Sequence, residues 1–343
     1  MSIRFAIIGF GHIGRRHALI INEFRDAELC GIIDINPDIQ NHAPYPSGIP
    51  FFTSLEEFFE KGPKVDVLNI ATPNGLHCIN ALTALSEKLH VVIEKPMGLS
   101  KNECEQVIYK SLQVSKHVFV VKQNRYSPPS KWMKDIVSHK TIGNVLMVQV
   151  NCFWNRDERY YTANNWKGSL NLDGGSLFTQ FSHFIDIMYW VFGDIKNIHS
   201  IMADFCHKDL TEFEDSGIVQ FEFINGGIGC INFSTSVWDK NMESSITVIG
   251  SKGSFKVGGQ YMNQIEYCHI EGYEMQVLEP TNPPNEYGLF KGSAANHHYV
   301  IENVINTLKG KDTITANALE GMKVVDIIER IYASARFEKI KNK

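Results

Sequence analysis

A glycine-rich segment near the N-terminus has the spacing of a loop that binds phosphate groups. Residues 9–14 read Gly-Phe-Gly-His-Ile-Gly and stand between a short apolar run and a segment with helical spacing. In such a loop the first glycine permits a tight turn, the second lets the backbone approach a pyrophosphate, and the third lets helix and strand pack closely. The helix N-terminus then offers free N–H groups and a positive dipole end to the phosphates. The strand, loop and helix context therefore predicts a dinucleotide site, against the alternative of an ordinary glycine-rich turn. The expected cofactor contacts are Gly9, Phe10, Gly11, His12, Ile13 and Gly14.

An acidic residue at the end of the second predicted strand fits the same site. Asp34 stands close to the spacing of about 20 residues at which such loops place a ribose ligand. Its carboxylate can accept hydrogen bonds from both ribose hydroxyls and would repel a 2′-phosphate. The next residues, Ile35 and Asn36, offer no arginine for that phosphate. The sequence therefore favours NAD over NADP, with Asp34 and Ile35 beside the adenosine ribose.

Two further segments follow predicted strands, where ligands of open α/β sheets bind. Glu94 and Lys95 end a buried-type strand, and we expect both to contact the cofactor. Lys95 can also hold a substrate hydroxyl or a developing carbonyl oxygen by a charge-assisted hydrogen bond. The alternative for Lys95 is an ordinary surface lysine. The segment 71–77 reads as a second cofactor loop, with contacts expected from Thr72, Pro73, Asn74 and His77, although His77 is equally compatible with a plain helix residue.

A histidine in the second half of the chain is the candidate acid/base. His183 lies in a predicted amphipathic helix over 176–192, with Thr179, Gln180 and Asp186 at helical spacing from it. Histidine titrates near neutral pH, so His183 could take an alcohol proton while NAD takes the hydride. The alternative is a histidine packed within the helix.

The elements that carry these residues predict two domains. Short apolar strands alternate with helices up to about residue 123, which is typical of a doubly wound parallel sheet, an α/β Rossmann domain. From residue 124 the pattern changes to long strands with hairpin turns, typical of an α+β domain with a large, mostly antiparallel open sheet. We expect residues 1–123 to bind NAD and residues 124–343 to bind substrate and support oligomerisation, with the C-terminal helix packing back on the first domain.

Composition excludes several other classes of protein. The formal net charge of −5 argues against nucleic acid as the main partner. The seven cysteines are scattered and form no C-x-x-C pair, so we expect neither disulfides nor a metal site. This cysteine usage fits a reducing compartment. We see no signal peptide and no apolar run of the roughly 20 residues that a membrane span needs. The cytoplasm is the expected location.

The placed motifs resemble those of the Gfo/Idh/MocA oxidoreductase family, over nearly the whole chain. They are Gly9-x-Gly11-x-x-Gly14, Ala71-Thr72-Pro73-Asn74-x-x-His77, Glu94-Lys95-Pro96, and His183-x-x-Asp186 after a glycine-rich turn. The resemblance implies an NAD-dependent oxidoreductase in which Lys95 holds the reacting hydroxyl and His183 is the acid/base. Many members carry an aspartate four residues before the histidine, where this chain has Thr179. The basicity of His183 would then depend more on Lys95 and on bound substrate.

The second domain resembles one subgroup of that family, the bacterial UDP-N-acetyl-2-amino-2-deoxyglucuronate dehydrogenases. The similar segments are 122–129, 149–154, 166–168 and 173–175. The resemblance implies oxidation of the C3 hydroxyl of UDP-N-acetylglucosaminuronic acid (UDP-GlcNAcA) to a 3-keto sugar, for lipopolysaccharide O-antigen and related surface polysaccharides. It also implies coupling to a pyridoxal-phosphate aminotransferase, and leaves open whether 2-oxoglutarate reoxidises NADH in place.

Charge and aromatic residues in the second half are compatible with a nucleotide sugar acid. Arg125, Arg156, Arg159 and Lys167 cluster in one segment, and bidentate arginine suits carboxylate and diphosphate. The alternative is a solvated loop with core aromatics. We expect Gln123 and Trp166 to contact the cofactor. The expected substrate contacts are Lys95, Arg125, Tyr126, Arg156, Tyr161, Trp166, Thr179, Gln180 and His183.

The sequence leaves open the substrate, whether the protein is catalytic, and whether it is a dimer or a tetramer. A same-fold enzyme could act on a free sugar or inositol, and a non-catalytic protein could bind NAD as a sensor. The large open sheet needs cover, so we expect a homodimer or homotetramer.

Overall fold

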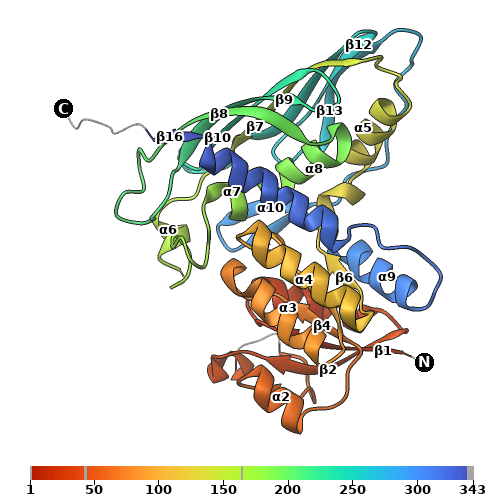
Figure 1. Cartoon of the computed structure of the whole chain (residues 1–343), viewed down its shortest axis with the longest axis vertical. Helices are drawn as coiled ribbons and strands as arrows, with labels where there is room; N and C mark the ends of the chain where they lie inside the picture. The colour runs from red at the N-terminus through yellow and green to blue at the C-terminus, as the bar shows by residue number, and fades with distance from the viewer. Residues whose placement is uncertain (1, 42–44, 164, 338–343) are drawn as a thin grey trace. The chain divides into compact units, whose positions relative to one another are not determined.

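The computed structural model describes residues 2–41, 45–163 and 165–337. The chain forms two compact units (Figure 1). The first comprises residues 1–122 and 297–325, and the second comprises residues 123–296 and 326–343. The predicted second domain ran from 124 to 343, of which 338–343 lie outside the described residues.

A six-stranded parallel sheet forms the centre of the first unit, as the sequence predicted. In chain order its strands are β1 (Ile3–Ile8), β2 (Ala27–Ile33), β3 (Phe51–Phe52), β4 (Val67–Ile70), β5 (His90–Ile93) and β6 (Val118–Val120). Their order in the sheet is β3-β2-β1-β4-β5-β6. The order reverses between β1 and β4, so the loops that follow these strands face the crevice where ligands of such sheets bind. Every residue of β4 is buried, as expected of a strand covered on both faces.

Helices cover this sheet, and serine caps fix where two of them begin. The helices of the first unit are α1 (His12–Glu23), α2 (Leu55–Lys61), α3 (His77–Ser86), α4 (Lys101–Val114) and α9 (His297–Leu308), with short 3₁₀ turns at Pro37–Asn41 and Asn74–Leu76. Ser54 accepts a hydrogen bond from the N–H of Glu57 at the start of α2, and Ser100 does the same from Glu103 at α4. Helices α3 and α4 lie side by side (Figure 1). Helix α10 (Ala318–Ala333) begins in the first unit and ends in the second.

The second unit is built on an eight-stranded sheet. Its strands are β7 (Val145–Phe153), β8 (Ile195–Ala203), β9 (Ser216–Phe223), β10 (Ile228–Ser234), β11 (Glu243–Gly250), β12 (Gly253–Gly258), β13 (Gln264–Ile270) and β16 (Ala335–Phe337). The order is β13-β12-β11-β7-β10-β9-β8-β16. Only the pairs β7–β10 and β8–β16 are parallel among these neighbours, so the predicted, mostly antiparallel sheet is confirmed. A separate hairpin joins β14 (Pro284–Tyr287) to β15 (Phe290–Ala294).

One face of this sheet carries the core. Residues of β10 alternate, with Ile231 and Phe233 buried and Cys230 and Asn232 on the opposite face. Helices α5 (Pro128–Ser138) and α8 (Ser182–Phe192) lie on the core side (Figure 1). Short helices occur at α6 (Glu158–Tyr161), α7 (Ser176–Thr179) and the 3₁₀ turn Gln123–Tyr126. No helix of the described residues is both long and apolar enough to span a membrane.

The prediction of one continuous helix over 176–192 is wrong. The helix is interrupted at Gln180 and Phe181, between α7 and α8. The backbone N–H groups of both residues donate to the carbonyl oxygen of Ser176. The helical hydrogen bonds of α8 then begin with the N–H of Phe184, which donates to the carbonyl oxygen of Phe181. Apolar periodicity continues across the break, because the Phe181 ring packs into the core against Trp154 at a centroid distance of 5.7 Å. Periodicity alone therefore could not locate it.

Candidate active site

The three glycines of the phosphate loop have the three geometries that the sequence predicted. Gly9 has φ +86°, and a Cβ there would lie 2.5 Å from the carbonyl oxygen of Ala71. A Cβ on Gly14 would lie 1.9 Å from the carbonyl oxygen of Gly9. By contrast, a Cβ on Gly11 would meet no atom within 4 Å. Gly11 therefore faces open space at the N-terminus of α1, where a pyrophosphate can approach the backbone.

Asp34 fastens the end of β2 to this loop. Its Oδ2 accepts the N–H of Phe10 at 2.7 Å, and its Oδ1 accepts the N–H of Asn36 at 2.9 Å. Each carboxylate oxygen has a further lone pair for a ribose hydroxyl. Ile35 is 92% exposed, whereas Phe10 is fully buried, so Phe10 serves the loop by packing and through its backbone. His12 is exposed and Ile13 is half-buried beside it.

His77 joins the loop after β4, where the sequence predicted cofactor contacts, to the segment that follows Lys95. Its Nδ1 lies 2.6 Å from the carbonyl oxygen of Pro96, and its Nε2 lies 2.9 Å from that of Thr72. The ring is buried, which lowers the pKa of His77, while the two carbonyl contacts oppose that shift. A neutral imidazole donates from one ring nitrogen only, so His77 hydrogen-bonds one of these carbonyls and packs against the other, which joins the two loops. Thr72 and Pro73 are half-buried and Asn74 is buried in the same loop.

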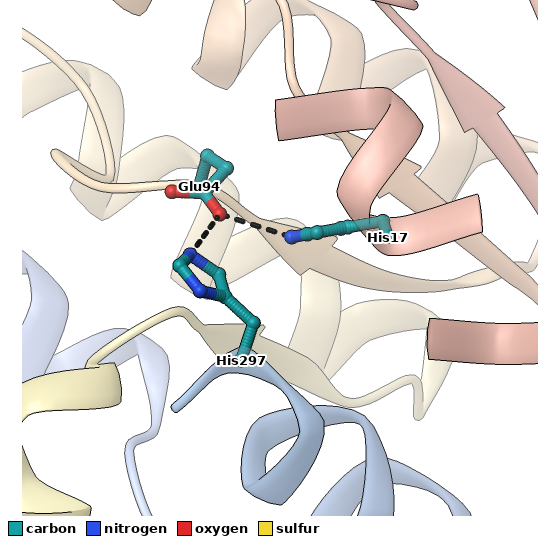
Figure 2. A group of neighbouring side chains, drawn as sticks. All are labelled: His17, Glu94 and His297. Atoms are coloured by element: carbon teal, nitrogen blue, oxygen red, sulfur yellow. Dashed lines mark hydrogen bonds and ion pairs between the residues drawn. The ribbon is translucent and has the colours of Figure 1, made fainter. Parts of the chain in front are cut away.

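The carboxylate of Glu94 collects hydrogen bonds from two histidines of distant segments (Figure 2). Its Oε1 lies 3.0 Å from Nε2 of His17 on α1 and 3.5 Å from Nε2 of His297 at the start of α9. Its Oε2 accepts the backbone N–H of Lys95 at 3.1 Å. Burial opposes ionisation of this carboxyl, but the histidine contacts hold the pKa of Glu94 well below its usual range. Glu94 is therefore a buried anion.

The protons in this group favour a hydrogen-bonded network over a metal site. The amide of Asn69 donates to Nδ1 of His17 at 3.1 Å, so the proton of that ring sits on Nε2 and points at Glu94. Nδ1 of His297 has no hydrogen-bond partner, which places its proton on Nε2 as well. Metal ligation would require the lone pairs of the two Nε2 atoms. The two imidazoles therefore stabilise Glu94 as neutral donors.

Lys95 lies in the chain between two backbone positions that the buried side chains of Glu94 and His77 hold. Its own N–H is held by Glu94, and the carbonyl of the next residue, Pro96, is held by His77. The Lys95–Pro96 peptide bond is cis, and the Lys95 side chain is half-buried. We expect Glu94 and His77 to act through the position that they give Lys95, while Lys95 itself is the group placed to touch substrate.

His183 lies in the first turn of α8, in the second unit, and is 7% exposed. The helix is held by a buried ion pair one turn further on, where Arg125 donates to both oxygens of Asp186 at 2.9 and 2.7 Å. Both side chains are 1% exposed. The sequence predicted Arg125 as a substrate ligand, whereas this geometry uses its guanidinium to fix the helix of His183.

Thr179 and Gln180 fill the break before α8 with hydrogen bonds. The hydroxyl of Thr179 donates to the carbonyl of Asp173 at 3.0 Å and also contacts the Asp173 carboxylate. Asp173 thus places a carboxylate beside Thr179, a contact that sequence spacing did not reveal. Gln180 accepts from Nε of Arg156 at 3.0 Å and donates to the hydroxyl of Tyr160 at 2.9 Å.

Arg156 is a buried cation whose hydrogen-bond acceptors are all neutral. Besides Gln180, its guanidinium donates to the carbonyl of Asn155, the amide oxygen of Asn241 and the carbonyl of Lys291. Nζ of Lys167 lies 3.5 Å from the ring centroid of Tyr160, on which Arg156 also stacks at 5.1 Å. Burial lowers the pKa of Lys167 to about 8; the charge of Arg156 adds to that shift, and the carboxylate of Asp173 opposes it.

No carboxylate of the described residues forms an ion pair with Arg156 or Lys167. Two cations so close together repel each other, and an anionic ligand would relieve that repulsion. The arrangement therefore suits an acidic substrate.

The other predicted substrate and cofactor contacts in this unit are distributed more widely. Tyr161 is buried against His207 and Phe213. Gln123 is buried and donates to Ser293 at 3.4 Å. Tyr126 and Trp166 are half-buried.

Arg159 forms a surface ion pair with Asp157, so it does not join the buried cations.

Comparison with known proteins identifies both halves of the chain. Residues 3–122 match the family model described as the oxidoreductase family, NAD-binding Rossmann fold, and residues 134–341 match the C-terminal alpha/beta domain of the same family. The glucose-6-phosphate 3-dehydrogenase of Bacillus subtilis is 26% identical over 296 residues, which are 83% of each chain.

Two solved structures are similar over almost the full length. The WlbA dehydrogenase of Bordetella pertussis, in complex with NADH and UDP-GlcNAcA, is 30% identical with a TM-score of 0.86, covering 97% of this chain and 96% of that one. The WlbA dehydrogenase of Chromobacterium violaceum, with the same two ligands, is 29% identical with a TM-score of 0.87, covering 97% and 93%.

The loop geometry predicts different outcomes for alanine at two of its glycines. Gly11→Ala is expected to change the melting temperature by less than about 2 °C and to weaken NAD binding by about tenfold or more, because its Cβ would occupy the phosphate approach. Gly14→Ala is expected to lower the melting temperature by about 3–10 °C, because its Cβ meets a backbone oxygen. Thermal unfolding and NAD titration measure both effects. Wild-type NAD affinity in Gly11→Ala would contradict the role given to this glycine.

Proposed function

This chain belongs to the Gfo/Idh/MocA oxidoreductase family and is an NAD-dependent enzyme, and from this premise we propose that it oxidises the C3 hydroxyl of UDP-GlcNAcA. The observation that carries the proposal is the full-length similarity, at 30% identity, to an enzyme crystallised with NADH and this nucleotide sugar. The buried cations Arg156 and Lys167 support it, since the substrate brings a carboxylate and two phosphates. Sugar phosphates such as the substrate named for the Bacillus subtilis relative are the nearest competing class.

The residues of the first unit fit the cofactor. Gly11 leaves the backbone open to a pyrophosphate, and Asp34 keeps lone pairs for the ribose hydroxyls. When bound, NAD supplies the acceptor for the hydride that leaves C3.

Lys95 and His183 divide the remaining chemistry. The ammonium of Lys95 donates a hydrogen bond to O3 and stabilises the partial negative charge that develops there. Nε2 or Nδ1 of His183 takes the hydroxyl proton as the C–O bond becomes a carbonyl. The products are a 3-keto sugar, NADH and protonated His183, which returns its proton to solvent.

A 3-keto sugar is the substrate type of an aminotransferase, so we place a pyridoxal-phosphate aminotransferase after this enzyme. Reoxidation of NADH in place by 2-oxoglutarate is the recycling variant of the same scheme. The seven cysteines are all free thiols, which suits the reducing cytoplasm.

Self-association through the second sheet completes the proposal. Its outer face combines exposed apolar side chains, such as Ile218 and Ile228, with amides such as Asn151 and Asn232. Such a face suits a second copy of this chain, which gives a homodimer or homotetramer.

Removal of either reacting side chain tests the mechanism. Lys95→Ala and His183→Ala are each expected to lower kcat by about 10²–10⁴-fold, because each removes charge stabilisation or proton transfer in the transition state. The assay is NADH formation with NAD and UDP-GlcNAcA, with and without 2-oxoglutarate and an aminotransferase. Lys61→Ala and His139→Ala are controls, since they remove the same side-chain types from exposed positions. Wild-type turnover with glucose 6-phosphate and none with UDP-GlcNAcA would overturn the substrate assignment.

The pKa of Lys167 predicts a limit at alkaline pH. Its ammonium loses its charge as pH rises through about 8, so kcat/KM for UDP-GlcNAcA is expected to fall there. In the complex the bound anion raises this pKa, so kcat should fall only at higher pH. Lys167→Met is expected to raise KM at neutral pH and to remove this alkaline limb. An unchanged KM and pH profile in that variant would exclude Lys167 from substrate binding.

A further inference from the structure

Three side chains of metal-ligand type meet in the connection between β8 and β9. They are Asp204, His207 and Asp215, and their candidate ligand atoms all lie within 4.8 Å of one another. Asp204 follows the end of β8, and Asp215 directly precedes β9. None of the three belongs to the residues that the proposed function uses.

The imidazole of His207 has its lone pair directed at this cluster. The side chain is 4% exposed, and its Nδ1 has no hydrogen-bond partner. Nδ1 lies 3.8 Å from Oδ2 of Asp215, too far for a hydrogen bond. The ring instead makes its hydrogen bond with the backbone of Arg156, so the proton sits on Nε2. A ligating histidine usually has this arrangement, with its other N–H on a backbone carbonyl.

The two carboxylates supply acceptor oxygens and also interact with each other, an interaction that a bound cation would replace. Asp215 is fully buried, and its Oδ2 accepts the N–H groups of Phe205 at 2.9 Å and Cys206 at 2.7 Å. Its Oδ1 has no partner. Oδ1 of Asp204 accepts the N–H of His207 at 2.9 Å.

We propose that Asp204, His207 and Asp215 bind one divalent transition-metal ion, with Zn²⁺ as the best-matched ion. Two carboxylate oxygens and one imidazole nitrogen are three of the four ligands that zinc takes, and water supplies the fourth. The ion would neutralise two carboxylates that otherwise repel each other. Imidazole favours Zn²⁺ over Mg²⁺, and the half-exposed Asp204 gives the ion a way in.

Such an ion would fix the β8–β9 connection against the segment that carries the buried cations. The ring of His207 packs on Tyr161 at a centroid distance of 5.3 Å and is bonded to the backbone of Arg156. The N–H of Glu212, in the same connection, donates to the carbonyl of Gly168 at 2.8 Å. The site is therefore structural, and its occupancy does not depend on which sugar the enzyme oxidises.

Calorimetric titration of chelator-treated protein with Zn²⁺ tests the proposal. The wild-type chain is expected to bind one ion with an affinity at least about tenfold higher than that of Asp204→Asn. In chelator, Asp204→Asn should keep or raise the melting temperature, because it relieves carboxylate repulsion and its amide oxygen can still accept the N–H of His207. Its loss of binding would then not reflect unfolding. Asp209→Asn, which removes an exposed carboxylate of the same connection, is the matched control and should bind as the wild type does.

Cobalt substitution and a second variant identify the ligands. Co²⁺ in the site should show d–d absorption without the charge-transfer band of a thiolate. Cys206→Ser removes the exposed thiol next to the cluster and should leave binding unchanged. The proposal fails if the wild type binds no Zn²⁺, if Asp204→Asn binds it equally well, or if Cys206→Ser abolishes binding.

Discussion

One buried negative charge, on Glu94, organises the part of the first unit that follows strand β5. A carboxylate removed from water is costly unless hydrogen-bond donors replace its hydration. Glu94 receives donors from His17, His297 and the backbone of Lys95. These residues come from the helix that begins at the phosphate loop, from the start of α9 and from the end of β5. A single ionised group thus holds together helix α1, the start of α9 and the backbone of Lys95.

The second unit is organised by the opposite charge. Arg156 is buried among aromatic rings and neutral acceptors, and Lys167 shares the Tyr160 ring with it. By contrast, Arg125 has its compensating carboxylate in Asp186 and therefore stabilises α8. The two arginines therefore differ in role: Arg125, paired with Asp186, completes the fold, whereas the charge of Arg156 is compatible with an acidic ligand. This difference also explains why a cluster of basic residues in the sequence does not by itself define a binding site.

Local patterns predicted the elements well, because strand and helix signals act over a few residues. The phosphate loop and the acid after β2 lie where the sequence predicted them. Contacts that form through the tertiary fold were beyond that reasoning. His17 and His297 are far apart in the chain, and nothing in their spacing links them to Glu94. Likewise, apolar periodicity hid the break before α8, and the carboxylate of Asp173 beside Thr179 became visible only when the loop was folded.

The most direct test is a double-mutant cycle on Glu94 and Lys95, measured as the single-turnover rate of NADH formation. A glutamine at position 94 has one acceptor oxygen, so it can satisfy the two histidines or the N–H of Lys95, but not both. Glu94→Gln is expected to slow hydride transfer by about 10- to 100-fold in the wild-type background, through misplacement of the lysine. In the Lys95→Ala background the same change should cost less than about twofold, because residues that act as a unit are not additive. Equal losses in the two backgrounds would contradict the account, since Glu94 would then act independently of Lys95.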